Sequence, residues 1–252
     1  MKAVFLCAGY GTRLYPLTED CPKPLLDIAD EALLTHLVRK LESLSSLEEV
    51  VIVSNDRFYP HFSQWREKLN FAKPVQIIND GTRDAEHRLG AIQDLKLGLQ
   101  TGKKDADALV IAGDNLFDSD FSRFTSFSES KRPAPCVGVY DVRDRVLAQK
   151  YGLIKTDSSG KISAFFEKPK DPPTTLASMG IYYLPQETLN LVDEYLEANR
   201  NPDAPGYYIS WLCQKVSVFA YPFEGTWFDI GDLSSYQKAD QYFRTRGESR
   251  KR

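Results

Sequence analysis

Two glycines and two basic side chains near the amino terminus could together bind a chain of phosphates. The apolar run Ala3–Ala8 is typical of a strand, and the turn that follows it contains Gly9 and Gly11. Because glycine has no Cβ, such a turn can present backbone N–H groups closely to phosphate oxygens. Arg13 and Lys23 place positive charge beside the turn. These residues predict a polyphosphate-binding loop at the end of a strand.

The spacing of these residues excludes two common phosphate-binding motifs. A Walker A loop requires Gly-x-x-x-x-Gly-Lys-Ser/Thr, which does not occur in the sequence. A dinucleotide fingerprint requires a third glycine where this chain has Leu14. Asp30 and Glu31 fall near the distance expected of its acidic residue, but they precede a predicted helix and do not end a strand. The loop therefore belongs to neither motif.

An acidic residue after a later strand could hold a metal ion. Asp114 and Asn115 follow the apolar run Ala108–Ala112, and open α/β sheets bind ligands beyond the carboxyl ends of their strands. Mg²⁺ uses few protein carboxylates and completes its coordination with phosphate oxygens and water. The tripeptide Gly-Asp-Asn that starts at Gly113 is equally typical of a turn. This motif alone therefore leaves open whether Asp114 binds a metal or only forms a turn.

Residues 6–25 closely resemble the signature of the sugar-1-phosphate nucleotidyltransferases. That signature reads Leu-x-x-Gly-x-Gly-Thr-Arg-Leu-x-Pro-Leu-Thr-x-x-x-Pro-Lys-Pro-Leu, and this sequence matches every fixed position. The resemblance extends through later motifs over most of residues 1–240. It implies the joining of a nucleoside triphosphate and a sugar 1-phosphate, with pyrophosphate released and Mg²⁺ as the cofactor. It also implies a Rossmann-like α/β/α fold around a mixed, mostly parallel sheet.

The resemblance implies a role for each matching residue. The matches to the family's nucleotide-binding positions are Leu6, Ala8, Gly9, Gly11, Thr12, Arg13, Lys23, Gly90 and Asp114. The matches to its sugar-phosphate contacts are Asn115, Glu167, Lys168 and Gly180. Arg13, Lys23 and Asp114 are the implied catalytic residues. Asp114 and Asp229, the latter in Trp-Phe-Asp-Ile-Gly, are the implied metal ligands.

Several positions depart from the family pattern or have a second interpretation. Ser178 replaces the family's Asn before the sugar-contacting glycine, and the loop before Gly90 differs, which leaves the nucleobase open. Asp232 stands where the family often has Thr, and we interpret it as the N-cap of the last helix. Glu167 and Lys168 are adjacent on a predicted strand, so we expect them to point to opposite faces without pairing.

The implied reaction requires no general base. The attacking sugar phosphate is already largely ionised at neutral pH, because its second pKa is about 6. Repulsion between anions is the main obstacle, so catalysis should rest on positioning and electrostatic stabilisation. Two alternatives stay open: a cytidylyltransferase for a non-sugar phosphorylated alcohol such as phosphocholine, and a non-catalytic regulatory subunit that binds nucleotide. The basic and acidic residues of the motifs favour an enzyme.

Composition is that of an ordinary globular protein. The chain has 252 residues, 42% hydrophobic and 27% charged, and a net charge of −3. Neither nucleic acid nor a membrane is an expected partner. Four cysteines form no C-x-x-C pair, so we expect neither disulfides nor a zinc site. We expect a cytoplasmic location, no catalytic histidine, and the short form of the family without a carboxy-terminal β-helix. The sequence leaves open whether the chain forms a homo-oligomer.

Hydrophobic periodicity predicts alternating strands and helices. In the first half, helical patterns are centred on residues 33–44, 58–69 and 89–99, and strands on residues 3–8, 50–53, 75–78 and 108–112. In the second half, short strands are expected at 137–140, 152–155, 162–166, 179–184 and 216–223, with helices at 189–196 and 233–243 and an element at 211–215. We expect one domain over 1–243, with a nucleotide half (1–115) and a sugar half (116–243), and a basic, disordered tail over 244–252.

Overall fold

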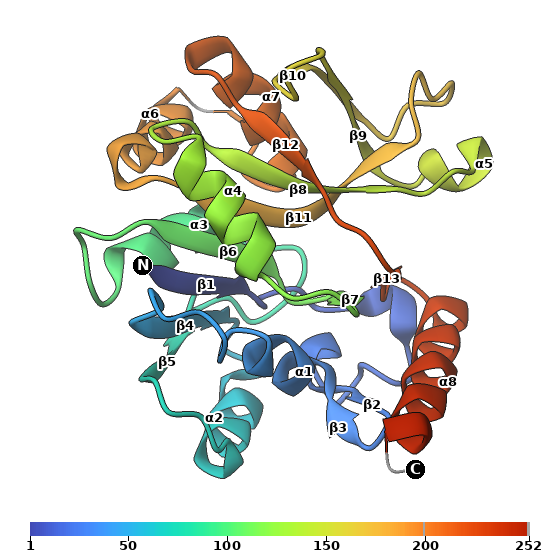
Figure 1. The fold of residues 1–252 in the computed structure, drawn as a ribbon. Helices are drawn as coiled ribbons and strands as arrows, with labels where there is room; N and C mark the ends of the chain where they lie inside the picture. Colours follow the sequence, from blue (N-terminus) through green and yellow to red (C-terminus); the bar gives the residue numbers. More distant parts are fainter. Residues whose placement is uncertain (199, 251–252) are drawn as a thin grey trace.

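The computed structural model describes residues 1–198 and 200–250, with side chains described as far as residue 246 (Figure 1). Its strands are β1 (Lys2–Leu6), β2 (Asp27–Ile28), β3 (Glu31–Ala32), β4 (Glu49–Ser54), β5 (Val75–Asn79), β6 (Ala108–Ala112), β7 (Asn115–Phe117), β8 (Cys136–Asp141), β9 (Gly152–Thr156), β10 (Ile162–Glu167), β11 (Leu176–Leu184), β12 (Phe219–Pro222) and β13 (Trp227–Asp229). Its α-helices are α1 (Leu33–Arg39), α2 (Tyr59–Lys68), α3 (Ala91–Gln100), α4 (Ser122–Ser130), α5 (Arg145–Ala148), α6 (Asn190–Glu197), α7 (Pro205–Lys215) and α8 (Leu233–Arg250). The 3₁₀ helices are η1 (Thr12–Leu14), η2 (Lys23–Leu25) and η3 (Gln186–Thr188).

The main sheet combines both halves of the chain. Its strand order is β10-β9-β11-β6-β1-β4-β5, with β8 pairing β11 and β12 pairing β8. β1 lies in parallel between β6 and β4, and β5 continues in parallel from β4. β11 pairs antiparallel with β6, and this pairing joins the second half to the first. The Rossmann-like fold with a mixed, mostly parallel sheet, predicted from the sequence, is confirmed.

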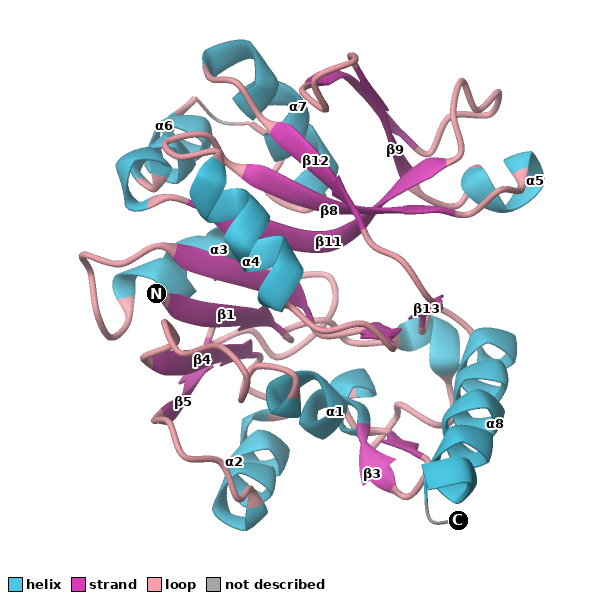
Figure 2. Ribbon diagram, viewed as in Figure 1, coloured by secondary structure: helices cyan, strands magenta, loops and turns pink. Residues whose placement is uncertain are grey.

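Different helices cover the two faces of the sheet (Figure 2). Because successive strand side chains point to opposite faces, Ala3 and Phe5 of β1 enter one buried cluster and Val4 enters another. Helices α1, α2, α4 and α8 contribute buried residues to the first cluster, and α3, α6 and α7 contribute to the second. This is the expected arrangement of three layers.

The predicted elements exist, with differences at their ends. The first helix ends at Arg39, whereas the apolar spacing predicted that it would reach Leu44. Leu41, Leu44 and Leu47 are nevertheless buried, in a series of turns with bonds from Leu44 N–H to the Leu41 carbonyl and from Leu47 N–H to the Leu44 carbonyl. Serines at 43, 45 and 46 favour turns because their hydroxyls compete for backbone hydrogen bonds.

Sequence reasoning missed α4 and the two-stranded sheet of β7 and β13. Helix α4 is rich in serine, which lowers its helix propensity, and it is held by aromatic packing of Phe124 on Tyr221 and Phe223. In the small sheet, Trp227 pairs with Phe117 and the strands run antiparallel. These strands have three residues each, too few to display a period.

The expectation of a disordered tail from residue 244 is wrong for residues 244–250, because α8 continues to Arg250. Arg244 pairs with Asp240 one turn earlier and with Asp30. Arg246 pairs with Asp118. Ion pairs with residues far away in the sequence thus hold the last turns of α8 against the rest of the protein. Residues 251 and 252 lie outside the described residues.

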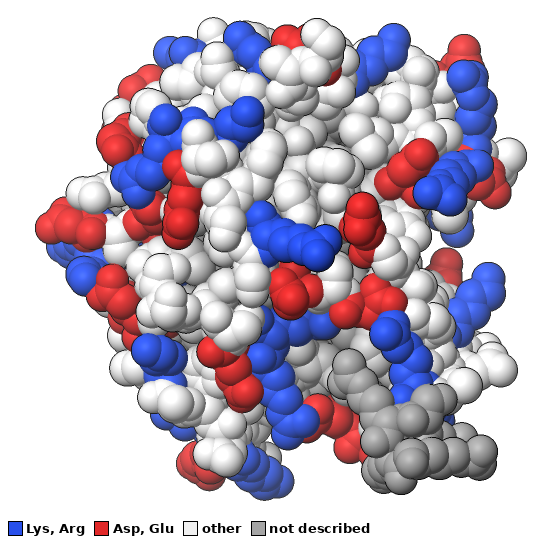
Figure 3. Space-filling view, viewed as in Figure 1, with Lys and Arg blue, Asp and Glu red and all other residues white. Residues whose placement is uncertain are grey.

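The surface carries charges of both signs. On the face shown in Figure 3, basic side chains lie beside acidic ones over most of the view. Among the helices that the structure describes, none combines the length and the apolar character needed to cross a bilayer.

Candidate active site

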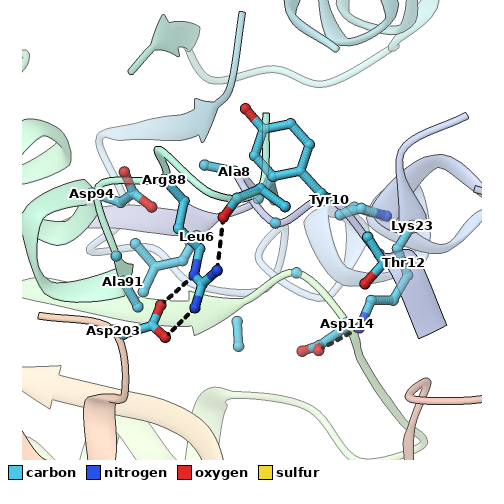
Figure 4. Close-up of a pocket in the computed structure, with 18 of the residues that line it drawn as sticks. Leu6, Ala8, Tyr10, Thr12, Lys23, Arg88, Ala91, Asp94, Asp114 and Asp203 are labelled. Carbon is cyan, nitrogen blue, oxygen red and sulfur yellow. Dashed lines mark hydrogen bonds and ion pairs between the residues drawn. The ribbon is translucent and has the colours of Figure 1, made fainter. Parts of the chain in front are cut away.

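A cavity of about 510 Å³ opens where β1 and β6 end (Figure 4). The predicted nucleotide-binding residues all line it: Leu6, Ala8, Gly9, Gly11, Thr12, Arg13, Lys23, Gly90 and Asp114. Its wall also includes residues that sequence reasoning did not select, among them Tyr10, Arg88, Asp94 and Asp203. The motifs after two neighbouring parallel strands therefore converge on one cavity, as the topology of open sheets requires.

The turn after β1 needs glycine at position 11 for both conformation and space. Gly11 has φ +64°, and a Cβ there would lie 3.2 Å from the Cβ of Thr18. The Thr18 hydroxyl donates a hydrogen bond of 2.8 Å to the Gly11 carbonyl, which fixes the turn. Gly9 faces open space, because a Cβ at this position would meet no atom within 4 Å. The loop is thus held from behind and left clear on the side of the cavity.

Lys23 and Asp114 form an ion pair in the cavity, with 2.8 Å between Nζ and Oδ2. Lys23 opens the short helix η2 between Pro22 and Pro24, whose fixed backbone angles restrict the segment. Burial would raise the pKa of Asp114, but the charge and hydrogen bond of Lys23, together with the charge of Arg13, lower it overall. Asp114 therefore presents a carboxylate beside a fixed ammonium group.

Asp229 lies next to this pair because β13 pairs with β7. The register places Asp229 opposite Asn115, and the Ile230 N–H donates a bond of 2.9 Å to the Asp114 carbonyl. Burial, and then the negative charge of Asp114, raise the pKa of Asp229 to about 6. Two partly buried carboxylates that repel each other are a place where a cation would be stabilised.

The donor set fits a magnesium ion that is shared with substrate. Within residues 1–198 and 200–250, no cluster of three or more acidic, histidine or cysteine side chains could enclose a metal. Asp114 and Asp229 therefore supply carboxylates, and other oxygens would have to come from elsewhere. This suits Mg²⁺, which binds through one or two carboxylates and keeps phosphate oxygens and waters in its remaining positions.

Asn115 and Gly180 lie together behind Asp114. Gly180 has φ +69° in a bulge of β11, and a Cβ there would lie 2.9 Å from the Cβ of Ala112. Asn115 is 3% exposed; it donates to the Ala112 carbonyl and accepts from the Trp227 Nε1 at 2.7 Å. In this position, Asn115 ties β7 to β13 and so supports the loop that carries Asp114.

Glu167 and Lys168 lie at the end of β10, where the expectation that they would not pair is wrong. Their charged groups are 3.6 Å apart. The strand ends at Glu167 and Lys168 has φ +44°, so the alternation of a strand no longer separates the two side chains. Neither residue lines the main cavity, and nor do Asn115, Gly180 and Asp229. The predicted sugar-phosphate residues thus lie outside the main cavity, with Asn115 and Gly180 in contact near Asp114 and with Glu167 and Lys168 at the end of β10.

A buried aspartate in the wall of the cavity lies near a second, partly buried one. Asp94 of α3 is 7% exposed, and burial, followed by the charge of Asp80, raises its pKa to about 8. Asp80 accepts the N–H of Thr82 at 2.7 Å, and the Thr82 hydroxyl accepts the Tyr10 hydroxyl at 3.0 Å. This network joins the glycine loop to α3. Its signal in the sequence was an aspartate on the apolar face of a predicted helix.

Three comparisons with known proteins concern the family and the fold of the chain. A family model described as nucleotidyl transferase matches residues 2–246. The bifunctional protein GlmU of Methanocaldococcus jannaschii is 28% identical over 245 residues, which cover 96% of this chain and 54% of that protein. The UTP–glucose-1-phosphate uridylyltransferase AglF of Haloferax volcanii is 27% identical over 244 residues, which cover 96% of each. The chain therefore spans about half of one relative and almost all of the other.

A solved structure shares the fold. The crystal structure of a UDP-glucose pyrophosphorylase complexed with UDP-glucose superposes with a TM-score of 0.79, covering 97% of this chain and 98% of that one. The sequences are 21% identical. At this identity, the likeness establishes the architecture of the chain.

Proposed function

Because the chain belongs to the nucleotidyl transferase family, we propose that it joins a nucleoside triphosphate to a sugar 1-phosphate and releases pyrophosphate. The observation that carries the proposal is the Lys23–Asp114 pair in a cavity lined by Gly9 and Gly11, with Asp229 beside it. A glycine loop, fixed cations and a carboxylate pair are what binding a triphosphate with a divalent ion requires.

The proposed roles follow from position and charge. Gly9 and Gly11 present the loop to the triphosphate, and Arg13 stabilises negative charge on the departing pyrophosphate. Lys23 stabilises the α-phosphate as the sugar phosphate oxygen attacks its phosphorus and the bond to the β-phosphate breaks. Electrostatic stabilisation by preorganised charges of this kind is typically the largest contribution to such catalysis.

Asp114 and Asp229 are the proposed holders of Mg²⁺. Bound there, the ion would neutralise charge on the phosphates of both substrates. Asp114 is already ionised in the protein because Lys23 and Arg13 lower its pKa, so it is ready to accept a cation at neutral pH. The proposed contacts to the sugar phosphate are Lys168, Glu167, Gly180 and Asn115.

The proposal is tested by a substrate screen. Pyrophosphate release is measured with Mg²⁺ and each of CTP, dTTP, UTP, GTP and ATP, paired with glucose, mannose or N-acetylglucosamine 1-phosphate, and with phosphocholine as a non-sugar acceptor. We expect release that requires one triphosphate and one sugar 1-phosphate, with the NDP-sugar identified by mass. Turnover with phosphocholine alone would contradict the sugar substrate. Nucleotide binding without turnover of any pair would contradict the enzymatic function.

A further inference from the structure

Arg88 and Asp203 form a two-pronged ion pair in the wall of the cavity. Arg88 Nε and Nη2 each lie 2.7 Å from an oxygen of Asp203. Arg88 Nη1 also donates to the Ala85 carbonyl at 2.7 Å, so the whole guanidinium group is held in one orientation. The side chains are 51% and 46% exposed, and a pair so open to water adds little to folding stability. Folding stability therefore does not explain why the pair lies in the wall of the cavity.

The pair lies at the end of the cavity away from the predicted phosphate site. In Figure 4, the two bonds between Arg88 and Asp203 lie on one side of the drawn pocket, and the Lys23–Asp114 pair lies on the other. If the phosphates bind at Lys23, the ribose and base extend toward Arg88. A planar guanidinium, held flat by its bonds, can stack on a base, and the Asp203 carboxylate can accept from ribose hydroxyls.

The pair also joins two segments that belong to different halves of the chain. We name residues 80–90 the base loop and residues 201–206 the strap. Beside the ion pair, the Ile92 N–H donates to the Pro202 carbonyl at 2.9 Å. A Cβ at Gly90 would lie 2.8 Å from the Pro202 carbonyl atoms, so the base loop touches the strap closely. The contact leaves no room for a side chain at position 90.

The other side of the strap reaches the predicted sugar-phosphate group. A Cβ at Gly206 would lie 2.2 Å from an oxygen of Glu167. Arg88 is the main cause of the lowered pKa of Asp203, and the charge of Lys168 contributes to it. One short segment is therefore in contact with the nucleotide cavity and with the group proposed for the sugar phosphate.

We propose that Arg88 and Asp203 are a positioning pair that clamps the base loop onto the strap, so that nucleoside triphosphate binding orders the sugar-phosphate site. The inference rests on the proposed function. Because the pair already holds the base loop against the strap, a nucleotide that stabilises this contact also stabilises the surroundings of Glu167. The binding free energies of the two substrates are then coupled, and the coupling is reciprocal.

Steady-state kinetics test the pair. For Asp203→Asn and Arg88→Gln, we expect the KM of the triphosphate to rise about tenfold, a typical size for such coupling, with kcat changed about twofold or less. The double exchange Arg88→Asp with Asp203→Arg should recover most of the loss. Arg39→Gln removes an ion pair with Glu31 that lies outside the cavity, and should leave both constants unchanged. An unchanged KM in Asp203→Asn, or a double exchange as impaired as the product of its single changes, would overturn the proposal.

Amide hydrogen exchange tests the clamp without turnover, which separates its failure from that of the proposed function. In the free protein, Asp203→Asn should accelerate exchange in both the base loop and the strap, including the amide of Ile92, and Arg39→Gln should not. In the wild type, whichever of CTP, dTTP, UTP, GTP and ATP binds with Mg²⁺ should slow exchange in both segments and around Glu167 together. Slowing of the base loop alone, or exchange unaffected by Asp203→Asn, would contradict the clamp even if the enzyme is active.

Discussion

At the scale of single residues, the site is defined by charges whose surroundings fix their protonation. Lys23 and Arg13 lower the pKa of Asp114, whereas Asp229 and Asp94 are pushed toward their neutral forms by burial and by a neighbouring carboxylate. Aspartates thus take different protonation states in and beside one cavity. Perturbed carboxylates in a cleft are typical of functional sites.

Replacing Lys23 by alanine removes the charge nearest to Asp114. We expect kcat to fall by about 10²–10³-fold, the usual loss when a preorganised charge is removed. Lys23→Arg, which keeps the charge but changes its shape, should lose less. Circular dichroism and thermal melting establish that the variants fold. Near-normal turnover of Lys23→Ala would remove Lys23 from the catalytic residues.

Asp94 should make the protein less stable as the pH rises. Its pKa is about 8 in the folded protein and near the ordinary aspartate value when unfolded. Between those two values the folded state keeps a proton that the unfolded state has lost, so stability falls as the pH rises through this window. Asparagine resembles the protonated side chain. Asp94→Asn should therefore stabilise the protein increasingly with pH, by on the order of 5 kcal/mol at pH 8.

Urea unfolding between pH 5 and pH 9 measures this difference. Asp105→Asn, in an exposed loop, is the matched control and should follow the wild type throughout. A gain in Asp94→Asn that does not depend on pH would mean that Asp94 is not protonated in the folded protein.

At the scale of elements, a position can require glycine for its backbone angle alone, or also because a Cβ would have no room. Gly180 and Gly160 both have positive φ, but a Cβ meets Ala112 at 2.9 Å in the first case and nothing closer than 3.8 Å in the second. Gly160→Ala should lose about 1 kcal/mol of stability from backbone strain alone. Gly180→Ala should lose roughly 2–4 kcal/mol, because a clash is added, and should raise the KM of the sugar phosphate. Equal losses in urea unfolding would show that the space around Gly180 is not limiting.

Local sequence patterns predicted the helices and strands, but they could not predict contacts between residues far apart in the chain. The phosphate loop could be predicted because its glycines and basic residues lie within residues 9–23 of one continuous motif. The Arg88–Asp203 pair could not, because 115 positions separate its members. Glu167 and Lys168 were expected not to pair because a strand was assumed to continue, and the pairing follows from where β10 ends.

At the scale of the whole molecule, one sheet places two groups of residues beside each other. Its first-half strands carry the glycine loop and Asp114 on their ends, and β11 brings Gly180 next to β6. β13 and α8 then return the end of the chain to the site, with Asp229 on β13 and Asp232 accepting the Ser235 N–H as the predicted N-cap of α8. The resemblance implied this convergence, and the pairing of strands explains it.

The most direct test is pyrophosphate release by the wild type, Asp114→Asn and Asp105→Asn, with Mg²⁺ and the substrate pair that the screen identifies. We predict release that depends on the sugar 1-phosphate, an approximately 10²–10³-fold lower rate in Asp114→Asn, and no change in Asp105→Asn. Release that does not need the sugar 1-phosphate, or a wild-type rate in Asp114→Asn, would contradict nucleotidyl transfer at this site.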